Sequence, residues 1–480
     1  MDRSLTAAPR TDASADPTAG VTGGRVVGAL CFSVMTLSVL QAAVVPVIPT
    51  IARQLGIGPT AVGWVLTANL LAAAVTTPVL GRLADQLGGR PVLIGVLMVV
   101  AAGSVLCVVA QSLTPLIVGR VLQGTAFALF PIGVAVLRAV LDERRLTHAI
   151  GLMSGIMAAG GGFGMVAAGL LVAGDGDHRR VFWMLLALSL IALVISWMSI
   201  PGTGVQRGRG GRTDTVGSVL LAVGLSALLL AIAQGGRWGT GLAVVSAVVG
   251  LVVLVWWYRH EKHCAAPLVS PGALTGRTVT PAHLAAFLIG AAMYVQFLGI
   301  AQFVQADLGV AGYGFGSTVL EASLIFLLPG SVAGALTASV SGRLVTRFRA
   351  DRVLVAMCAV GAAAFALLVL AHGRPWQMVV AVVVVNVFVS GAYAALPALL
   401  VDAVPVSGTA VVNGMNAIAR IFGSSLASAV IAALLAAMTV PGTGAAAESA
   451  YVIAFGLGAA VAAGAGVAAV STRWLSKNKY

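Results

Sequence analysis

Long apolar runs separated by short polar segments extend over most of the chain. Within a run the apolar residues are continuous, a pattern that predicts helices and argues against a β-barrel. A helix needs about 20 apolar residues to cross the hydrocarbon of a bilayer. Fourteen runs have roughly that length, at about residues 26–52, 60–80, 91–111, 114–141, 147–173, 181–200, 216–234, 239–258, 281–306, 315–341, 353–372, 376–402, 407–438 and 450–471. The sequence therefore predicts an all-α polytopic membrane protein.

One polar segment recurs in the second half of the chain. Residues 81–90 and 342–351 both begin Gly-Arg-Leu, both lie between two apolar runs, and are 261 positions apart. A six-helix unit over residues 26–200 occupies only about 175 positions, so further helices must lie between two such units. The runs at 216–234 and 239–258 account for the difference. We predict six helices, an inserted pair, and six more.

This plan divides the chain into five parts. The N-terminal part is polar and lacks the basic start and short apolar core of a signal peptide. We expect a disordered cytoplasmic tail at 1–24, an N-terminal six-helix bundle at 25–200, a linker with two inserted transmembrane helices at 201–280, a C-terminal six-helix bundle at 281–472, and a cytoplasmic tail at 473–480.

Composition and charge support a membrane protein. Of the 480 residues, 59% are hydrophobic and 9% are charged. The net charge of +13 would suit nucleic acid, but the basic residues sort by side of the membrane. With a cytoplasmic N-terminus, Arg120 and Arg420 lie within runs, and the others lie inside except Arg53, Arg179, Arg180, Arg237 and Arg374. This distribution predicts a multi-pass protein of the cell inner (plasma) membrane with both termini cytoplasmic, and no nucleic-acid partner. Binding of anionic lipid by the basic clusters is the alternative.

The cysteines predict no disulfide and no metal site. Cys31, Cys107 and Cys358 lie in apolar runs, Cys264 lies in a predicted cytoplasmic loop, and no two are near neighbours. The sequence also lacks an HExxH motif and a GxxxxGK[ST] loop. We therefore expect no cofactor, no metal and no enzyme activity.

The recurring loop has the residues of a conformational latch. Its glycines permit close approach of helix ends, a carboxylate can bond a helix N-terminus, and arginines can bond carbonyls or acids. The candidates are Gly81, Arg82, Asp85, Gly89, Arg90, Gly342 and Arg343. The alternative is a solvated loop that only obeys the positive-inside rule.

Two charged residues within apolar runs are candidates for proton coupling. A charge inside a membrane helix is costly, so Arg120 is expected to be paired, hydrated or functional. Snorkelling to the outer surface is the alternative. Glu321 precedes Gly342 by 21 residues, or ~32 Å of helix, which places it near the outer boundary of the hydrocarbon. It is either a proton-exchanging carboxylate or a residue of a wet vestibule.

Four segments resemble motifs of the major facilitator superfamily. They are the loop at 81–90, residues 116–124 around Arg120, residues 64–67, and residues 413–425. The fourteen predicted spans resemble its drug:proton antiporter branch. The resemblance implies the major facilitator fold, with two six-helix bundles plus two inserted central helices (14 TM), and a role for Arg120 in proton coupling.

The glycine-rich fifth helix resembles the antiporter motif of that branch. The family pattern has a Gly-Pro pair, whereas Gly164 is followed by Met165. Small residues three or four apart also permit close helix crossing. We assign Gly160, Gly164 and Gly169 to helix packing, and also Arg420, for which a substrate contact is the alternative.

A substrate site is expected near the midplane between the two halves. The candidate polar residues are Gln41, Thr67, Asn69, Gln123, Tyr294, Gln302 and Gln305. Such residues also bond neighbouring helices. Few residues are aromatic, so we expect a mostly aliphatic cavity that suits an apolar or amphiphilic molecule.

These features favour a proton-coupled secondary transporter that exports a lipophilic small molecule, such as a drug, antibiotic or toxic metabolite. Its expected partners are the substrate, protons and the lipid bilayer, and we expect a monomer. The alternatives are a metabolite uptake permease of the same superfamily and a non-transporting membrane scaffold.

Overall fold

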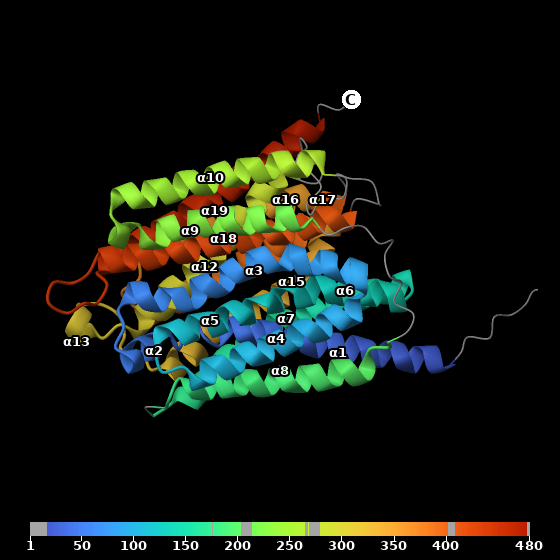
Figure 1. Ribbon diagram of the computed structural model, residues 1–480. Helices are drawn as coiled ribbons and strands as arrows, with labels where there is room; N and C mark the ends of the chain where they lie inside the picture. Colours follow the sequence, from blue (N-terminus) through green and yellow to red (C-terminus); the bar gives the residue numbers. More distant parts are fainter. Residues whose placement is uncertain are drawn as a thin grey trace, which may run out of the picture.

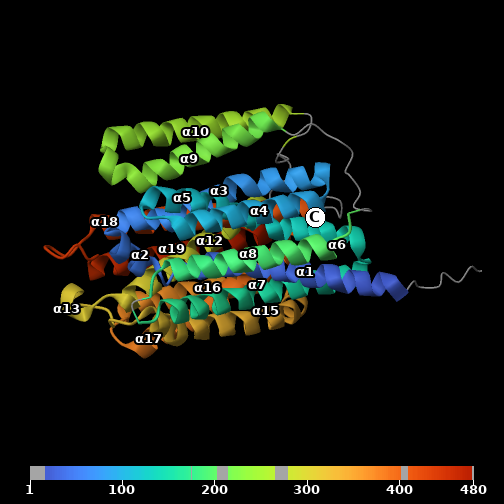
Figure 2. The same cartoon turned by 60° about the horizontal axis from the view of Figure 1, so that its bottom comes forward.

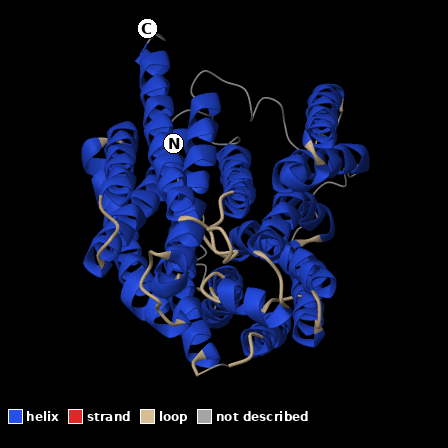
Figure 3. Cartoon of the chain, turned by 90° about the vertical axis from the view of Figure 1, so that its left-hand side faces the viewer, coloured by secondary structure: helices blue, strands red, loops and turns tan. Residues whose placement is uncertain are grey.

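The computed structural model describes residues 17–174, 176–202, 214–264, 267, 279–401 and 409–477. Long helices run side by side along one direction (Figure 1). Apart from an isolated bridge between Thr439 and Ala446, the described ranges consist of helices, turns and loops (Figure 3). The predicted all-α membrane class is confirmed.

The first half of the chain contains six long helical rods and one short helix. A single 3₁₀ turn joins α5 to α6 without a break in the helical path. The elements are α1 (Pro17–Ala42), α2 (Ile48–Leu55), α3 (Pro59–Leu87), α4 (Gly89–Val109), α5 (Leu113–Gly124), η1 (Thr125–Ala128), α6 (Leu129–Val140), α7 (Glu143–Val172) and α8 (Arg179–Ser199).

A helical pair and six further rods follow. A π-helical segment, η2, joins α14 to α15. The elements are α9 (Thr215–Trp238), α10 (Thr240–His263), α12 (Val279–Gln305), α13 (Leu308–Ala311), α14 (Val319–Glu321), η2 (Ala322–Leu327), α15 (Leu328–Phe348), α16 (Ala350–Leu370), α17 (Pro375–Val401), α18 (Thr409–Ala437) and α19 (Glu448–Lys477).

The sequence repeat corresponds to a repeated local structure. Helices α4 and α16 each have 21 residues, and a single residue separates each of them from the preceding helix. The connecting residues are Gly88, with φ 94° and ψ 148°, and Arg349, with φ 70° and ψ 143°. Arg349 follows Gly88 by the same 261 positions. The second half therefore holds an arginine in a left-handed conformation that favours glycine.

Twelve helices of the described ranges are long and apolar enough to cross a membrane. The rods α7 and α9 contribute shorter apolar stretches, Ala159–Val172 and Val216–Leu228. The chain is a multi-pass membrane protein. The count of fourteen spans stays a prediction, as does the division into five parts.

The pair α9 and α10 lies on the outside of the helix assembly (Figure 2). Helix α9 packs against α3 and α18, whereas α10 packs mainly against α9. Val244, Val248 and Val252 of α10 are exposed. An apolar face of this kind suits lipid, because a bilayer leaves no water to penalise it.

Glycines bring helices together where they cross. A side chain at Gly423 of α18 would overlap the carbonyl oxygen of Phe287 on α12, and one at Gly290 would overlap that of Arg420. Membrane helices associate by close packing rather than by the hydrophobic effect, so small residues at crossings set the helix positions.

We expect Gly423→Ala to destabilise the protein by about 1–3 kcal/mol, because the new methyl group forces α12 and α18 apart. The matched control is Gly95→Ala on α4, where an added Cβ meets no atom within 4 Å. Thermal unfolding of both purified variants in detergent checks this. Equal unfolding midpoints would show that this crossing tolerates a larger separation.

Candidate functional site

Arg120 on α5 is buried inside the first half, with 1% of its surface exposed. Its Nε donates to the carbonyl oxygen of Val65 at 2.9 Å. Its Nη1 donates to Gln123 Oε1 at 2.8 Å and to the Leu40 carbonyl at 3.4 Å. These acceptors come from α3, α5 and α1. The cation is thus held by neutral oxygens, and the side chain does not snorkel to the outer surface.

Two further amides support this arrangement. Gln123 Nε2 donates to Ser104 Oγ at 2.9 Å, which links α5 to α4. Asn69 Nδ2 donates to the backbone carbonyl of Arg120 at 3.0 Å. Gln123 and Asn69 are 1% and 4% exposed, so they lie in the packed interior of the first half. Both orient Arg120 and its helix in this conformation.

Glycines make the close approach of α3, α4 and α5 possible. A Cβ at Gly124 would lie 2.7 Å from that of Ala72 on α3. A Cβ at Gly119 would lie 2.7 Å from the carbonyl oxygen of Gly103 on α4. Larger residues at these positions would separate the helices and move the acceptors away from Arg120.

Hydrogen bonds between residues of the described ranges join the first half to the second. Gln41 Nε2 on α1 donates to the Tyr294 hydroxyl on α12 at 2.9 Å. The hydroxyls of Thr67 on α3 and Ser428 on α18 are 3.0 Å apart. Gln305 Nε2 donates to the carbonyl of Pro46 at 3.1 Å. Ser428 was not among the residues predicted from the sequence, and Gln302 lies half-buried on α12.

Small residues pack the halves together near the same helix ends. A Cβ at Gly63 of α3 would lie 2.6 Å from the Cβ of Ala432 on α18. A Cβ at Gly169 of α7 would lie 2.8 Å from the Cα of Leu320 on α14. In the predicted orientation, these positions are in the outer halves of their helices. The outer ends of the two halves are therefore packed against each other.

The glycines of α7 serve two faces of the helix. Gly160 and Gly164 face α1, where an added Cβ would lie 3.1 Å from Met35 and 3.0 Å from Val39. Gly169 faces the second half instead. Helix α7 is thus packed between α1 on one side and α14 and α15 on the other.

In the second half, Arg420 on α18 lies over the ring of Tyr393, 4.6 Å from its centroid. Its Nη1 donates to Asn416 Oδ1 at 2.7 Å. The Tyr393 hydroxyl donates to Met293 Sδ at 3.5 Å. Unlike Arg120, Arg420 is only partly buried. Its contacts link α17 and α18, and part of its surface remains accessible to a ligand.

Glu321 lies in the first helical turn after the α13–α14 loop, rather than well inside a helix. Its Oε2 accepts hydrogen bonds from the backbone N–H and the hydroxyl of Thr318, at 2.8 and 3.0 Å. Glu321 N–H donates in return to Thr318 Oγ1 at 3.2 Å. The side chain is exposed and completes a capping box. This geometry accounts for Glu321 as a helix cap, and its role in proton coupling stays a prediction.

Residues 81–90, predicted to form a loop, are instead the last residues of α3, Gly88 and the start of α4, and they make contacts within the first half. Arg90 Nη2 donates to the carbonyl of Trp197 at the end of α8, at 3.0 Å. A Cβ at Gly89 would meet Val136 Cγ2 on α6 at 2.5 Å. Gly81 and Arg82 are half-buried, and Arg343 is exposed. The side-chain positions of Asp85 and Gly342 lie outside the described residues, so a latch between the halves stays a prediction.

An open apolar groove of about 380 Å³ lies between α1 and α7. In the predicted orientation it is on the cytoplasmic side. Its lining is formed by Gly24, Val27, Gly28, Cys31, Phe32, Met35, Leu152 and Ile156. This lining has almost no polar surface and suits an apolar ligand or a lipid chain.

This architecture is similar to that of known proteins. The family model of the Major Facilitator Superfamily matches residues 30–214. The crystal structure of the nucleoside transporter NupG superposes with a TM-score of 0.63 at 14% identity, covering 93% of this chain and 99% of that one. A human organic anion transporter superposes with a TM-score of 0.60 at 13% identity, covering 92% and 99%. These likenesses show the fold.

Proteins similar in sequence are named for different transport or resistance roles. An MFS-type transporter of Mycobacterium tuberculosis is 31% identical over 58% of this chain and 40% of its own length. The uridine/deoxyuridine transporter of Lactococcus lactis is 29% identical, covering 64% and 65%. The methylenomycin A resistance protein of Streptomyces coelicolor is 26% identical, covering 74% and 73%. The chain thus spans less than two thirds of the first two relatives. All are named for transport or resistance rather than for an enzyme activity.

We expect Tyr294→Phe to weaken the outer contact between the halves while leaving each half intact. Loss of one neutral hydrogen bond costs about 1 kcal/mol, or roughly fivefold in a conformational equilibrium. With spin labels at the exposed positions Arg53 on α2 and Val310 on α13, a larger fraction of molecules should show a long distance between the two labels. The matched control is Tyr313→Phe, which removes a bond to the Ala446 carbonyl within the second half. An equal effect of both variants would reject a specific role for Tyr294.

Proposed function

We propose that this chain, which belongs to the major facilitator superfamily, is a secondary transporter that exports a lipophilic small molecule by alternating access. The observation that carries the proposal is the way the halves meet. Short hydrogen bonds and small residues join them at the outer helix ends, including Gln41–Tyr294 and Thr67–Ser428. A hydrogen bond between neutral groups is worth only about 1 kcal/mol, so these bonds can be broken and remade as the halves rock.

A lipophilic substrate is supported by the surfaces on the inner side. The groove between α1 and α7 is apolar. Arg420, stacked on Tyr393 and partly exposed, adds one cationic donor and one aromatic face. The combination suits an amphiphilic molecule with a polar or anionic group. The similarity to a methylenomycin A resistance protein over 74% of this chain supports an antibiotic-like substrate.

Nucleoside uptake is the second candidate. The uridine/deoxyuridine transporter of L. lactis is 29% identical over 64% of this chain. Gln41, Tyr294 and Asn416 carry the amides and hydroxyl that bond a base or a ribose. The first candidate is favoured because these groups already bond one another or Arg420 in this conformation.

Proton coupling is proposed as an indirect role for Arg120. A guanidinium keeps its proton under physiological conditions, so Arg120 is not expected to carry the transported proton. It contributes a fixed positive charge whose acceptors come from α1, α3 and α5. Movement of α1 or α3 during the cycle would change these bonds. A proton would have to bind elsewhere, and the exposed Glu321 is the carboxylate proposed for that step.

Everted membrane vesicles with a preset pH gradient test this function. Addition of lipophilic antibiotics should dissipate the gradient only in vesicles that contain the protein. Arg120→Lys keeps the charge but loses part of the forked hydrogen bonding. One hydrogen bond to a charged group is worth ~1.5–3 kcal/mol, so we expect a transport rate of about one tenth of that of the unaltered protein, or lower still. The matched control, Arg374→Lys at an exposed outer position, should transport normally.

The alternatives give different results in the same system. Uptake of labelled uridine by intact cells, without any antibiotic-linked proton movement, would replace export by nucleoside uptake. No substrate-linked proton movement and no uptake would leave the scaffold interpretation. Equal rates in Arg120→Lys and the unaltered protein would remove Arg120 from the mechanism.

A further inference from the structure

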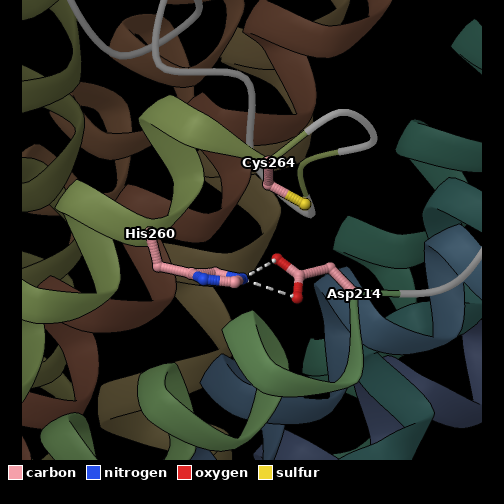
Figure 4. Close-up of side chains that lie close together, drawn as sticks. All are labelled: Asp214, His260 and Cys264. Atoms are coloured by element: carbon pink, nitrogen blue, oxygen red, sulfur yellow. Dashed lines mark hydrogen bonds and ion pairs between the residues drawn. The ribbon is translucent and has the colours of Figure 1, made fainter.

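Three side chains with metal-binding atoms converge at the base of the inserted pair (Figure 4). His260 Nε2 lies 2.9 and 3.1 Å from the two carboxylate oxygens of Asp214. The ligand atoms of Asp214, His260 and Cys264 all lie within 4.8 Å of one another. They come from the residue that precedes α9 and from the last turn and the end of α10. In the predicted orientation this point is on the cytoplasmic side.

The fold holds Asp214 firmly in place. It is the N-cap of α9, and its Oδ1 accepts a hydrogen bond from the N–H of Gly217 at 2.7 Å. Any side chain at Gly217 would overlap the carboxylate. The Asp214 side chain is 3% exposed and that of His260 is 29% exposed. The Asp214 carboxylate is thus buried, whereas the His260 imidazole reaches water, so an ion has a path of entry.

The partners of Asp214 favour its charged form. Burial raises the pKa of this carboxyl, but hydrogen bonds from Gly217, His260 and Cys264 and the nearby imidazole outweigh burial, so the pKa lies below its usual range. The close crossing of α9 and α10, where a Cβ at Gly250 would meet the Leu228 nitrogen at 2.8 Å, fixes the distance between the two helix ends.

We propose that Asp214, His260 and Cys264 bind a divalent transition metal, with Zn²⁺ the best fit. A carboxylate, an imidazole and a thiolate are all zinc ligands. Tetrahedral zinc requires its ligand atoms to be about 3.3–3.8 Å apart, so the carboxylate and imidazole need to separate by less than about 1 Å. Water would complete the coordination. The ion would replace the His260–Asp214 hydrogen bonds and tie the start of α9 to the end of α10.

The site is separate from the transport machinery proposed above. It lies at the predicted cytoplasmic end of the inserted pair, where α9 begins and α10 ends. Metal binding at these three side chains does not require any particular transported substrate. The competing interpretation is a hydrogen-bonded helix cap with no affinity for metal.

Co²⁺ titration of the full-length protein in detergent with a phosphine reductant tests the site. Co²⁺ serves as the probe because a bound thiolate gives it a charge-transfer band. We expect one Co²⁺ per chain, displaced by Zn²⁺, with the band lost in Cys264→Ser and the affinity at least tenfold lower in His260→Gln. The matched control is His263→Gln, whose imidazole is exposed and bonds the Arg259 carbonyl instead. It should bind Co²⁺ as the unaltered chain does.

Thermal unfolding keeps the test decisive if a variant is unstable. Asn is as good an N-cap as Asp, so Asp214→Asn should fold with a similar midpoint without metal. Zn²⁺ at 100 times its dissociation constant should stabilise the unaltered chain and His263→Gln, and leave Asp214→Asn unchanged. Absence of the charge-transfer band at saturating Co²⁺, or equal Zn²⁺ stabilisation of all variants, would overturn the proposal.

Discussion

A guanidinium buried among apolar helices has to find its hydrogen-bond acceptors inside the protein. Arg120 finds them on the backbone of α1 and α3 and on Gln123. This requirement fixes the relative positions of three helices. Glycines at the helix crossings let the helices come close enough for the acceptors to reach Arg120. The halves then join through other residues at their outer ends. The packed core of the first half and the hydrogen bonds between the halves are thus built from different residues.

Much of the fold follows from local sequence. Continuous apolar runs predicted the helices, and the offset of 261 positions predicted that the segment around residues 81–90 recurs in the second half, whereas the one-residue connections at Gly88 and Arg349 were not predicted. Arg120 and Gln123, three residues apart, are neighbours on any helix. These features depend on residues close in the chain or on exact repetition, so a single sequence carries them.

Contacts between segments far apart in the chain were harder to predict from the sequence. Gln41 and Tyr294 are 253 residues apart, and their bond depends on the packing of two complete halves. Glu321 lies in an apolar run, yet the loop ends only at Thr318, so the carboxylate caps a helix. The expectation of no metal site rested on the cysteine positions and on the absence of an HExxH motif. His260 and Cys264, four residues apart, were a visible signal, but Asp214 joins them only through the antiparallel packing of α9 and α10.

In the proposed transport cycle the two halves separate at their outer ends. Thr67→Cys combined with Ser428→Cys tests it most directly, because the native hydroxyls are 3.0 Å apart across α3 and α18. Oxidation should form a disulfide that blocks transport in proteoliposomes, and reduction should restore it, while each single cysteine variant transports with or without oxidant. A fully cross-linked protein that transports at the unaltered rate would contradict the account.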